Sequence, residues 1–302
     1  MQRFPESDAK YEYSAAHTSI GTVEPGEVFE VESVEGYSGY FRSPSDFTPE
    51  SYARAEAQKW AVVGPIAVAG AQAGGAVAVT IHDVEVATPG VVTYGAYDRD
   101  VEPLEWWDDE TAADVYPIEN GVVRFDEHTS LPTRPLIGCL AVMPAEDGVH
   151  AKLQGRYGGN LDCRELRAGA RMILPVERDG AGLYFGDCKA LMGDSEIVGP
   201  PEVGAVVTAS AVPLARPASM EWPWIETADE LMTLVSGRPL EWSARHAFRE
   251  LLNWVCDDYD LPRAKAALLL AMVAHARIAQ ISNVAYTSYC VAPRDVLSAY
   301  AR

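Results

Sequence analysis

The sequence predicts an α+β fold with a β-rich, sandwich- or barrel-like core that a C-terminal helical hairpin closes on one side. Short alternating or apolar runs bounded by turn residues recur through the first 215 residues, as strands require. The last quarter instead has apolar residues spaced three and four apart, which indicates helices. We therefore predict a β-rich core at residues 1–215, with most of the functional site, and a helical portion at residues 216–302 packed on it as one integrated unit.

Strand patterns begin at residues 22–32, where polar and apolar side chains alternate across a Pro-Gly turn. Similar runs predict strands at residues 64–68, 76–81, 136–142, 171–176 and 203–212. Residues 60–81 carry so little charge that they resemble a membrane span. Because Pro65 and several glycines interrupt this stretch, we expect two buried strands around a turn.

Two helices are expected after residue 240. Ser243 is predicted to cap the first, whose apolar positions continue to Val255. Pro262 suits the first turn of the second, which we expect from residue 264 to about residue 281. His246 and His275 are interpreted as packing or surface residues rather than ligands.

Charge and cysteine content exclude several classes of function. The formal net charge of −20 is spread along the chain and repels phosphate backbones and anionic membranes, so we expect neither nucleic acid nor membrane as a partner. Five cysteines without a CxxC spacing argue against a disulfide framework and a tetrathiolate zinc site. No signal-peptide pattern is visible at the start of the sequence, and we expect a cytoplasmic protein.

Glycines and carboxylates concentrate between Gly158 and Gly199. The run Gly158-Gly159-Asn160-Leu161-Asp162 is followed by a second segment with four ionisable side chains: Asp187, Lys189, Asp194 and Glu196. Glycines on both sides are typical of loops that aim polar groups into a cleft, although two solvated acidic turns would have the same composition. Cys188 lies between Asp187 and Lys189 and is a weaker candidate nucleophile, because no base can be assigned to it.

The order of several motifs along the chain resembles the acetamidase/formamidase family. These motifs are Gly64-Pro65-Ile66-Ala67-Val68, Gly138-Cys139, Gly158 to Asp162, Leu174-Pro175-Val176, Gly186-Asp187, Gly193-Asp194-Ser195-Glu196 and Arg277-Ile278-Ala279-Gln280. The resemblance runs from about His17 to Leu297. It implies a smaller α/β portion beside the β-rich fold, a homo-oligomer (dimer or higher), and hydrolysis of small linear or cyclic amides with a divalent metal such as zinc and no organic cofactor.

Carried over residue by residue, the resemblance implies site residues and one departure from the family pattern. Asp187 and Glu196 match carboxylates of the Gly-Asp-x-His and Gly-Asp-Gly-Glu motifs, and His17 matches an early histidine, which implies His17 and Asp187 as metal ligands. The motif histidine is replaced by Lys189, and an ammonium repels a divalent cation and has no free lone pair. Either the metal is absent, or fewer ligands hold it, or the pKa of Lys189 is depressed by burial.

We therefore predict a small-molecule hydrolase with the catalytic residues Asp187, Lys189, Asp194 and Glu196 and with Gly159, Asn160 and Asp162 at the substrate. With a metal, the cation activates water and Glu196 passes the proton to the amine. Without one, Lys189 stabilises the oxyanion while Glu196 or Asp187 is the base. The alternatives are a non-hydrolytic step (cyclisation, isomerisation or elimination) in specialised metabolism, or an inactive binding protein. Four aromatic residues either line the pocket or belong to the core: Tyr37, Tyr40, Trp106 and Trp107.

Overall fold

A computed structural model describes residues 1–94 and 112–301 of the chain. Two large open sheets dominate it, and no closed barrel forms among these residues. The nine-stranded sheet has the order β1 (Gln2–Phe4), β5 (Val28–Ser33), β20 (Ala205–Leu214), β7 (Ala76–Val86), β17 (Arg171–Pro175), β21 (Trp224–Glu226), β22 (Glu230–Gly237), β24 (Tyr286–Pro293) and β23 (His275–Gln280).

The second large sheet carries the residues of the candidate site. Its order is β15 (Gln154–Gly155), β16 (Gly158–Asn160), β13 (Leu136–Ala141), β18 (Leu183–Lys189), β19 (Glu202–Val203), β8 (Gly90–Tyr94) and β9 (Ala112–Tyr116). Strand β6 (Val62–Val68) pairs with β18, β2 (Ala9–Lys10) and β4 (Gly21–Val23). The smaller sheets are β10 (Ile118–Glu119) with β11 (Val122–Arg124) and β12 (Ser130–Pro132), and β3 (Glu12–Tyr13) with β14 (Val149–His150).

The main hydrophobic core lies between the two large sheets. Alternate residues of β20, such as Val207 and Ala209, are buried there because successive side chains of a strand point to opposite faces. Phe29 of β5 and Phe185 of β18 meet across the layers with ring centroids 5.9 Å apart. These contacts confirm the β-rich prediction and leave the polar ends of β18, β16 and β19 free to form a site.

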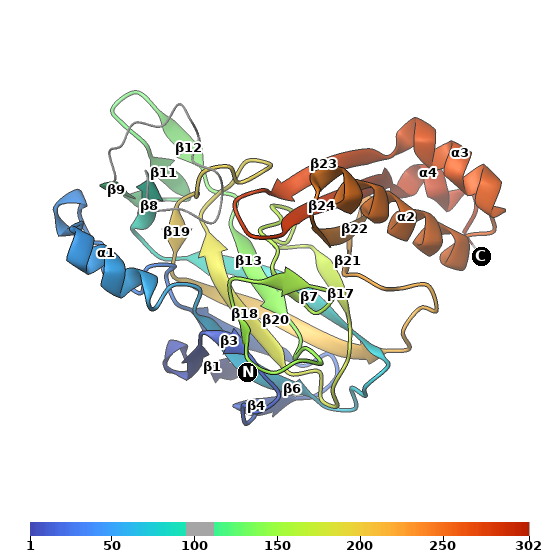
Figure 1. The fold of residues 1–302 in the computed structure, drawn as a ribbon, viewed down its shortest axis with the longest axis horizontal. Helices are drawn as coiled ribbons and strands as arrows, with labels where there is room; N and C mark the ends of the chain where they lie inside the picture. The colour runs from blue at the N-terminus through green and yellow to red at the C-terminus, as the bar shows by residue number, and fades with distance from the viewer. Residues whose placement is uncertain (95–111, 302) are drawn as a thin grey trace.

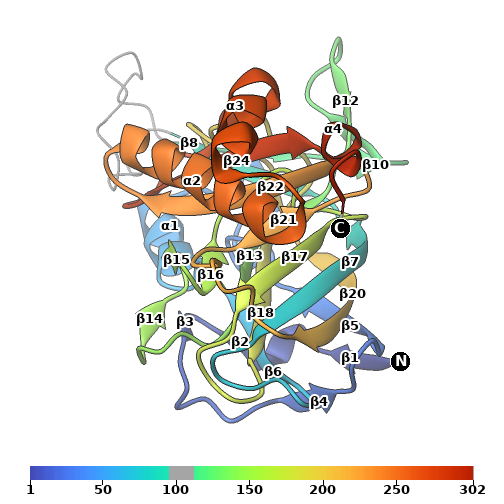
Figure 2. The same cartoon turned by 90° about the vertical axis from the view of Figure 1, so that its right-hand side faces the viewer.

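Helices cover the C-terminal end of the nine-stranded sheet. Helices α2 (Leu240–Asp258), α3 (Arg263–Val273) and the short α4 (Arg294–Ser298) pack with β22 and β24 around a second core, while α1 (Pro49–Glu56) lies at the other side of the molecule (Figures 1 and 2). Residues 216–302 thus contribute four strands as well as helices.

Two segments of the C-terminal portion differ from the sequence prediction, and residues 60–81 follow it. Ser243 does not cap α2, which begins at Leu240 after Pro239; its hydroxyl instead donates to the Leu240 carbonyl at 2.9 Å inside the helix. Residues 275–280 form β23 rather than helix, since pairing with β24 overrides their weak helical preference. Residues 60–81 form β6, a turn and the start of β7, as expected, and no helix among the described residues is long and apolar enough to cross a membrane.

Candidate functional site

The ammonium group of Lys189 lies at the centre of four carboxyl groups. Its Nζ is 2.8 Å from Asp187 Oδ2, 3.0 Å from Glu202 Oε1, 3.3 Å from Asp162 Oδ1 and 3.8 Å from Glu196 Oε1. All five side chains are more than nine-tenths buried. We call these five residues the Lys189 cluster.

Four separate segments bring the cluster together. Asp187 and Lys189 lie two apart on β18 and so share a face of the strand. Asp162 follows β16, Glu202 begins β19, and Glu196 lies in the loop between β18 and β19. The backbone of the Glu196 loop is held by β23, because Ser195 N–H donates to the Ile278 carbonyl at 2.9 Å and Ile281 N–H donates to the Ser195 carbonyl at 2.9 Å.

Backbone strain is concentrated in the same residues. Asp162, Asp187 and Glu196 have φ values of 46°, 57° and 36°, in the left-handed region that non-glycine residues rarely adopt. Such strain persists only where the surrounding structure imposes it, and it is found most often at functional sites. Three of the four carboxyl groups are therefore held in position at a conformational cost.

Gly138 of β13 makes room for the carboxylates. A Cβ at this position would lie 2.5 Å from Asp187 Oδ2 and 2.6 Å from Asp162 Oδ1. Any side chain would thus collide with two members of the cluster. This close approach explains the glycine in the Gly138-Cys139 motif.

Three polar side chains complete the hydrogen bonding. Ser282 donates to Glu196 Oε2 at 3.2 Å, and Asn283 Nδ2 donates to Asp162 Oδ2 at 3.3 Å. With the amide nitrogen of Asn160 turned toward the carboxylates, this residue donates to Asp187 Oδ2 at 2.8 Å and to Asp162 Oδ2 at 2.9 Å. The loop after β23 therefore belongs to the site together with the β-rich core.

The carboxyl groups of the cluster differ in protonation. Burial and the charge of Asp162 raise the pKa of Glu196 well above its ordinary value, and burial and Asp187 do the same for Glu202. Burial raises the pKa of Asp162 to about 6. Burial also acts against ionisation of Asp187, but the Lys189 ammonium and hydrogen bonds from neighbouring carboxyls lower its pKa. These shifts favour the protonated forms of Glu196 and Glu202, the ionised form of Asp187, and ionisation of Asp162 above about pH 6.

Lys189 stays charged in this setting. Burial alone would lower its pKa, but four carboxyl groups, led by Asp187, raise it well above the ordinary value for lysine. The depressed pKa considered from the sequence is therefore wrong.

The geometry does not fit a divalent cation at this position. A metal ion bound by Asp162, Asp187 and Glu202 would have to occupy the space of the ammonium nitrogen, whose charge repels it. Among residues 1–94 and 112–301, no three His, Cys, Asp or Glu side chains form another group suited to a metal. We derive no chemical step through a metal.

A small cavity of about 40 Å³ adjoins the cluster. It is also lined by Tyr37, Lys59, Trp60 and Thr93, and the Lys59 ammonium lies 4.6 Å from the centre of the Trp60 ring. Trp60 has a φ of 63°, which is strained for a bulky residue. Tyr37 belongs to a small buried hydrophobic cluster and also lines the cavity, while Tyr40 packs against that cluster. Trp106 and Trp107 lie outside the described residues.

Three sequence-predicted candidates lie away from Lys189. His17 directs its ring nitrogens to the Tyr184 hydroxyl at 3.1 Å and to Glu12 at 3.6 Å, and not to Asp187. Asp194 accepts a hydrogen bond from Tyr289 at 2.9 Å on the outer side of its loop. Cys188 points into the core, and burial raises the pKa of its thiol to about 12, which excludes a thiolate at neutral pH.

The structure adds functional candidates that the sequence reasoning missed. They lie outside the motifs of residues 158–199 and are Glu202, Ser282, Asn283 and Lys59. For Glu202 there was a signal, since it follows a Pro-Pro pair directly after Gly199 and interrupts an apolar run. Gly159 lies in β16 with a φ of 98°, and a Cβ there would meet the Leu153 carbonyl at 2.4 Å, so its role is to allow close backbone packing.

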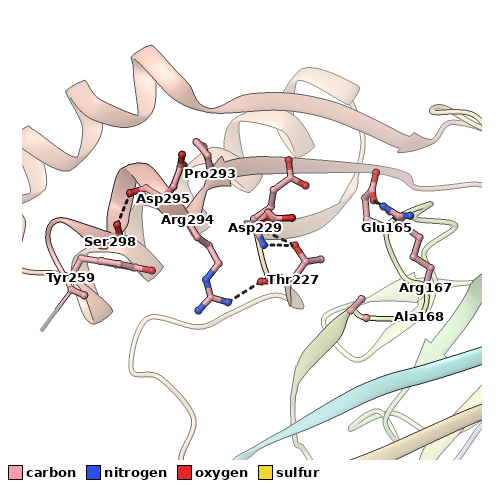
Figure 3. Close-up of a pocket in the computed structure, with 15 residues that line it drawn as sticks. Glu165, Arg167, Ala168, Thr227, Asp229, Tyr259, Pro293, Arg294, Asp295 and Ser298 are labelled. Atoms are coloured by element: carbon pink, nitrogen blue, oxygen red, sulfur yellow. Dashed lines mark hydrogen bonds and ion pairs between the residues drawn. The ribbon is translucent and has the colours of Figure 1, made fainter.

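A cavity of about 950 Å³ lies elsewhere among the described residues, between the Glu165 loop and α4. Both of its arginines pair with neighbouring groups: Arg294 donates to the Thr227 carbonyl at 2.9 Å, and Arg167 lies 3.0 Å from Glu165 (Figure 3). It contains none of the residues of the Lys189 cluster. We therefore assign the chemistry to the smaller cavity.

Comparisons with known proteins show which proteins this chain is similar to. The model of the Acetamidase/Formamidase family matches residues 144–216, which include Asn160, Asp187, Lys189 and Glu196. A recombinant predicted acetamidase/formamidase from Thermoanaerobacter tengcongensis is similar over 99% of this chain and 97% of its own, with 27% identity and a TM-score of 0.90. No curated protein matches the sequence.

Two more distant structures share the fold. An acetamidase from Bacillus halodurans is 24% identical, with 99% of both chains covered and a TM-score of 0.91. A gamma lactamase from Delftia acidovorans is 15% identical over 96% of this chain and 89% of its own, with a TM-score of 0.65. The fold of this chain is therefore shared with both structures.

Proposed function

We propose, from the match of residues 144–216 to the acetamidase/formamidase family and the likeness of nearly the whole chain to a predicted member, that the protein hydrolyses the carbon–nitrogen bond of a small linear or cyclic amide with Lys189 as its fixed positive charge. The observation that supports this proposal most directly is the buried ammonium among four carboxyl groups beside a cavity of about 40 Å³. A cavity of this size admits a carboxamide group and a water molecule but little more.

Lys189 acts on the carbonyl oxygen. When water adds to the amide carbon, the oxygen gains a negative charge, and an ammonium fixed in a buried site stabilises that charge more strongly than water does. Lys189 keeps its proton because its pKa is raised, so it is neither base nor nucleophile. Asp187, at 2.8 Å, holds the ammonium in place.

Proton transfer falls to the pair formed by Asp162 and Glu196. The two carboxyl groups share a hydrogen bond in which Glu196 carries the proton. Asp162, with a pKa of about 6, takes a proton from the attacking water, and Glu196 gives its proton to the leaving nitrogen. The C–O bond forms, the C–N bond breaks, and ammonia or an amine leaves with the proton that Glu196 supplied.

This assignment refines the roles predicted from the sequence. Asp187 is a weak base because its pKa is lowered, which leaves Glu196 with Asp162 as the better acid–base pair. Asn160 and Asn283 orient the carboxylates and the amide. Asp194 anchors its loop to Tyr289 rather than touching the substrate. A cytoplasmic location and a homo-oligomeric state remain predictions.

The proposal is tested by Glu196→Gln in an ammonia-release assay with formamide, acetamide, propionamide and 2-pyrrolidinone, the last followed by chromatography of the ring-opened product. We expect kcat to fall about 10²–10⁴-fold with the fold retained, because the glutamine cannot donate the proton. Glu177→Gln is the matched control, since Glu177 lies on the surface 3.5 Å from Arg216. Hydrolysis at the wild-type rate in Glu196→Gln would remove Glu196 from the reaction, and absence of hydrolysis of every amide by the wild type would refute the proposed function.

A further inference from the structure

An apolar groove of about 400 Å³ adjoins the Lys189 cluster on the side of β9, β11 and β12. We define it by five residues: Tyr116, Phe125, Leu131, Ile197 and Val198. Its volume is about ten times that of the cavity at Lys189 and lies in the range of ligand-binding pockets. The groove is thus large enough for an alkyl chain or an aromatic ring.

The groove is continuous with the candidate active site. Glu196 and Gly199 line both the groove and the small cavity at Lys189. Ile197 and Val198 directly follow Glu196 in the chain, so the residue proposed to protonate the leaving nitrogen forms the boundary between an acidic cavity and an apolar surface. A ligand that occupies both spaces would place its polar and apolar parts on opposite sides of Glu196.

Exposed apolar side chains gather at this groove. Phe125, Ile197, Leu131 and Val198 are 51%, 49%, 38% and 37% exposed, and they make up four of the twelve large exposed hydrophobic residues of the described chain. A contiguous apolar surface of this kind marks a binding site more often than scattered single residues do. Tyr116 and Phe125 stack with centroids 5.4 Å apart and planes inclined by 19°, which gives one wall a flat surface.

Backbone hydrogen bonds fix the opposite wall, which Ile197 and Val198 form. Ser195, two residues before Ile197, exchanges backbone hydrogen bonds of 2.9 Å with Ile278 and Ile281. Ser195 and Glu196 both have positive φ values, 85° and 36°, and turn the chain so that Ile197 and Val198 face outward. A wall fixed before the ligand arrives loses little conformational entropy on binding.

We infer that the groove binds an apolar group of the substrate, so that the preferred substrate is an amide with an alkyl chain of about four or more carbons or an aromatic ring rather than formamide or acetamide. This inference rests on the proposed function, since it places the carboxamide beside Lys189 and the apolar group against Phe125 and Ile197. A polar amide alone would fill the small cavity and leave the groove empty.

The test compares kcat/KM for acetamide, butanamide, hexanamide and phenylacetamide. Each methylene buried in the groove should raise kcat/KM about fourfold, which amounts to roughly 10²-fold between acetamide and hexanamide. Phe125→Ser should reduce the hexanamide-to-acetamide ratio by about tenfold, because it removes the flat wall without adding charge. Leu268→Ser is the matched control, since Leu268 is 57% exposed on α3, outside the groove, and its ratio should equal that of the wild type.

Other outcomes overturn the inference in distinguishable ways. Hydrolysis of acetamide with no increase for longer amides would refute the groove as a substrate site while the proposed function stands. If no amide is hydrolysed, titration calorimetry with urea and benzylurea tests the groove instead. Tighter binding of benzylurea than of urea, lost in Phe125→Ser, supports the groove as an apolar ligand site. Equal affinities for urea and benzylurea refute it. If sedimentation shows that Phe125→Ser converts an oligomer to a monomer without changing the substrate ratio, the groove is a subunit contact and the inference is wrong.

Discussion

Replacing Lys189 with methionine removes the counter-ion of a buried acidic cluster at nearly constant side-chain volume. At pH 7.5 the change deprives Asp162 and Asp187 of the cation that favours their ionised forms. Removing one partner from a buried ion pair typically costs about 3–5 kcal/mol. Protonation of Asp162 limits part of this cost: at the wild-type pKa of about 6, neutralising it at pH 7.5 would cost roughly 2 kcal/mol at about 1.4 kcal/mol per pH unit, and the cost falls as its pKa rises without the ammonium.

The variant should therefore lose about 3–5 kcal/mol of unfolding free energy at pH 7.5, or roughly 6–10 °C in Tm for a chain of this size. The loss should also depend on pH. Without the ammonium, the folded-state pKa values of Asp162 and Asp187 both rise, because the cation that favours their ionised forms is gone, so the folded variant binds protons more tightly than the folded wild type does. Lowering the pH from 8 to 6 then restores stability to the variant, whereas in the wild type Asp187 stays ionised and Asp162 takes up a proton only as the pH approaches 6.

Urea denaturation followed by tryptophan fluorescence at pH 8, 7 and 6 measures this difference directly. Lys10→Met is a matched control, because Lys10 is only partly buried and its ammonium donates to the Asp8 carbonyl at 3.2 Å; a change within about 1 kcal/mol is expected there. A Lys189→Met protein as stable as the wild type at pH 8, with the same pH dependence, would refute the reasoning, since it would mean that the cluster is already neutral without lysine.

Three further predictions concern the same cluster. Gly138→Ala should abolish activity and destabilise the fold by about 1–3 kcal/mol, because the added Cβ would lie 2.5 Å from Asp187 Oδ2. The control Gly193→Ala should do neither, because the space around Gly193 is open. Equal urea midpoints for the two variants would contradict this packing argument. The acid limb of kcat/KM should have its midpoint near pH 6, where Asp162 takes up a proton, and Asp162→Asn should remove that limb together with most of the activity; a limb that persists in this variant would assign it to another group. Lys189→His should take up zinc that the wild type does not, because the imidazole removes one positive charge and supplies a nitrogen ligand; unchanged zinc uptake by elemental analysis would mean that residue 189 is not at a metal position.

The sequence predicted the strands well because their signal is local. The runs that became β6, β7, β13, β17 and β20 alternate or are continuously apolar between turn residues, and this pattern needs no knowledge of the partner strand. The helix prediction for residues 275–280 was wrong because the signal for this strand is not local. Their backbone hydrogen bonds go to β24, and no local pattern could outweigh the Ala- and Leu-rich helix that precedes them.

The residues of the candidate site show the same contrast between local and non-local signals. Asn160, Asp162, Asp187, Lys189 and Glu196 were found because glycine-rich turns and charged residues are neighbours in the chain. Ser282 and Asn283 were missed because only the bonds between Ser195 and β23 bring their loop to Glu196. His17 was chosen from the resemblance alone, and the fold places it at Tyr184 instead.

Lys189 shows why a single substitution in a motif needs the structure for its interpretation. From the sequence, a lysine in place of a histidine allowed an absent metal, a weakened metal site or a neutral amine. The distances decide between a neutral amine and an ammonium, because a group within 3.3 Å of three carboxyl groups is held in its charged form. They also show that the four acidic residues around it belong to one electrostatic unit, in which the charge that disfavours a divalent cation is the one that we propose for the developing oxyanion. A scaffold that retains its carboxylates while gaining an internal cation can thus keep amide hydrolysis as its chemistry and change the origin of the charge that supports it.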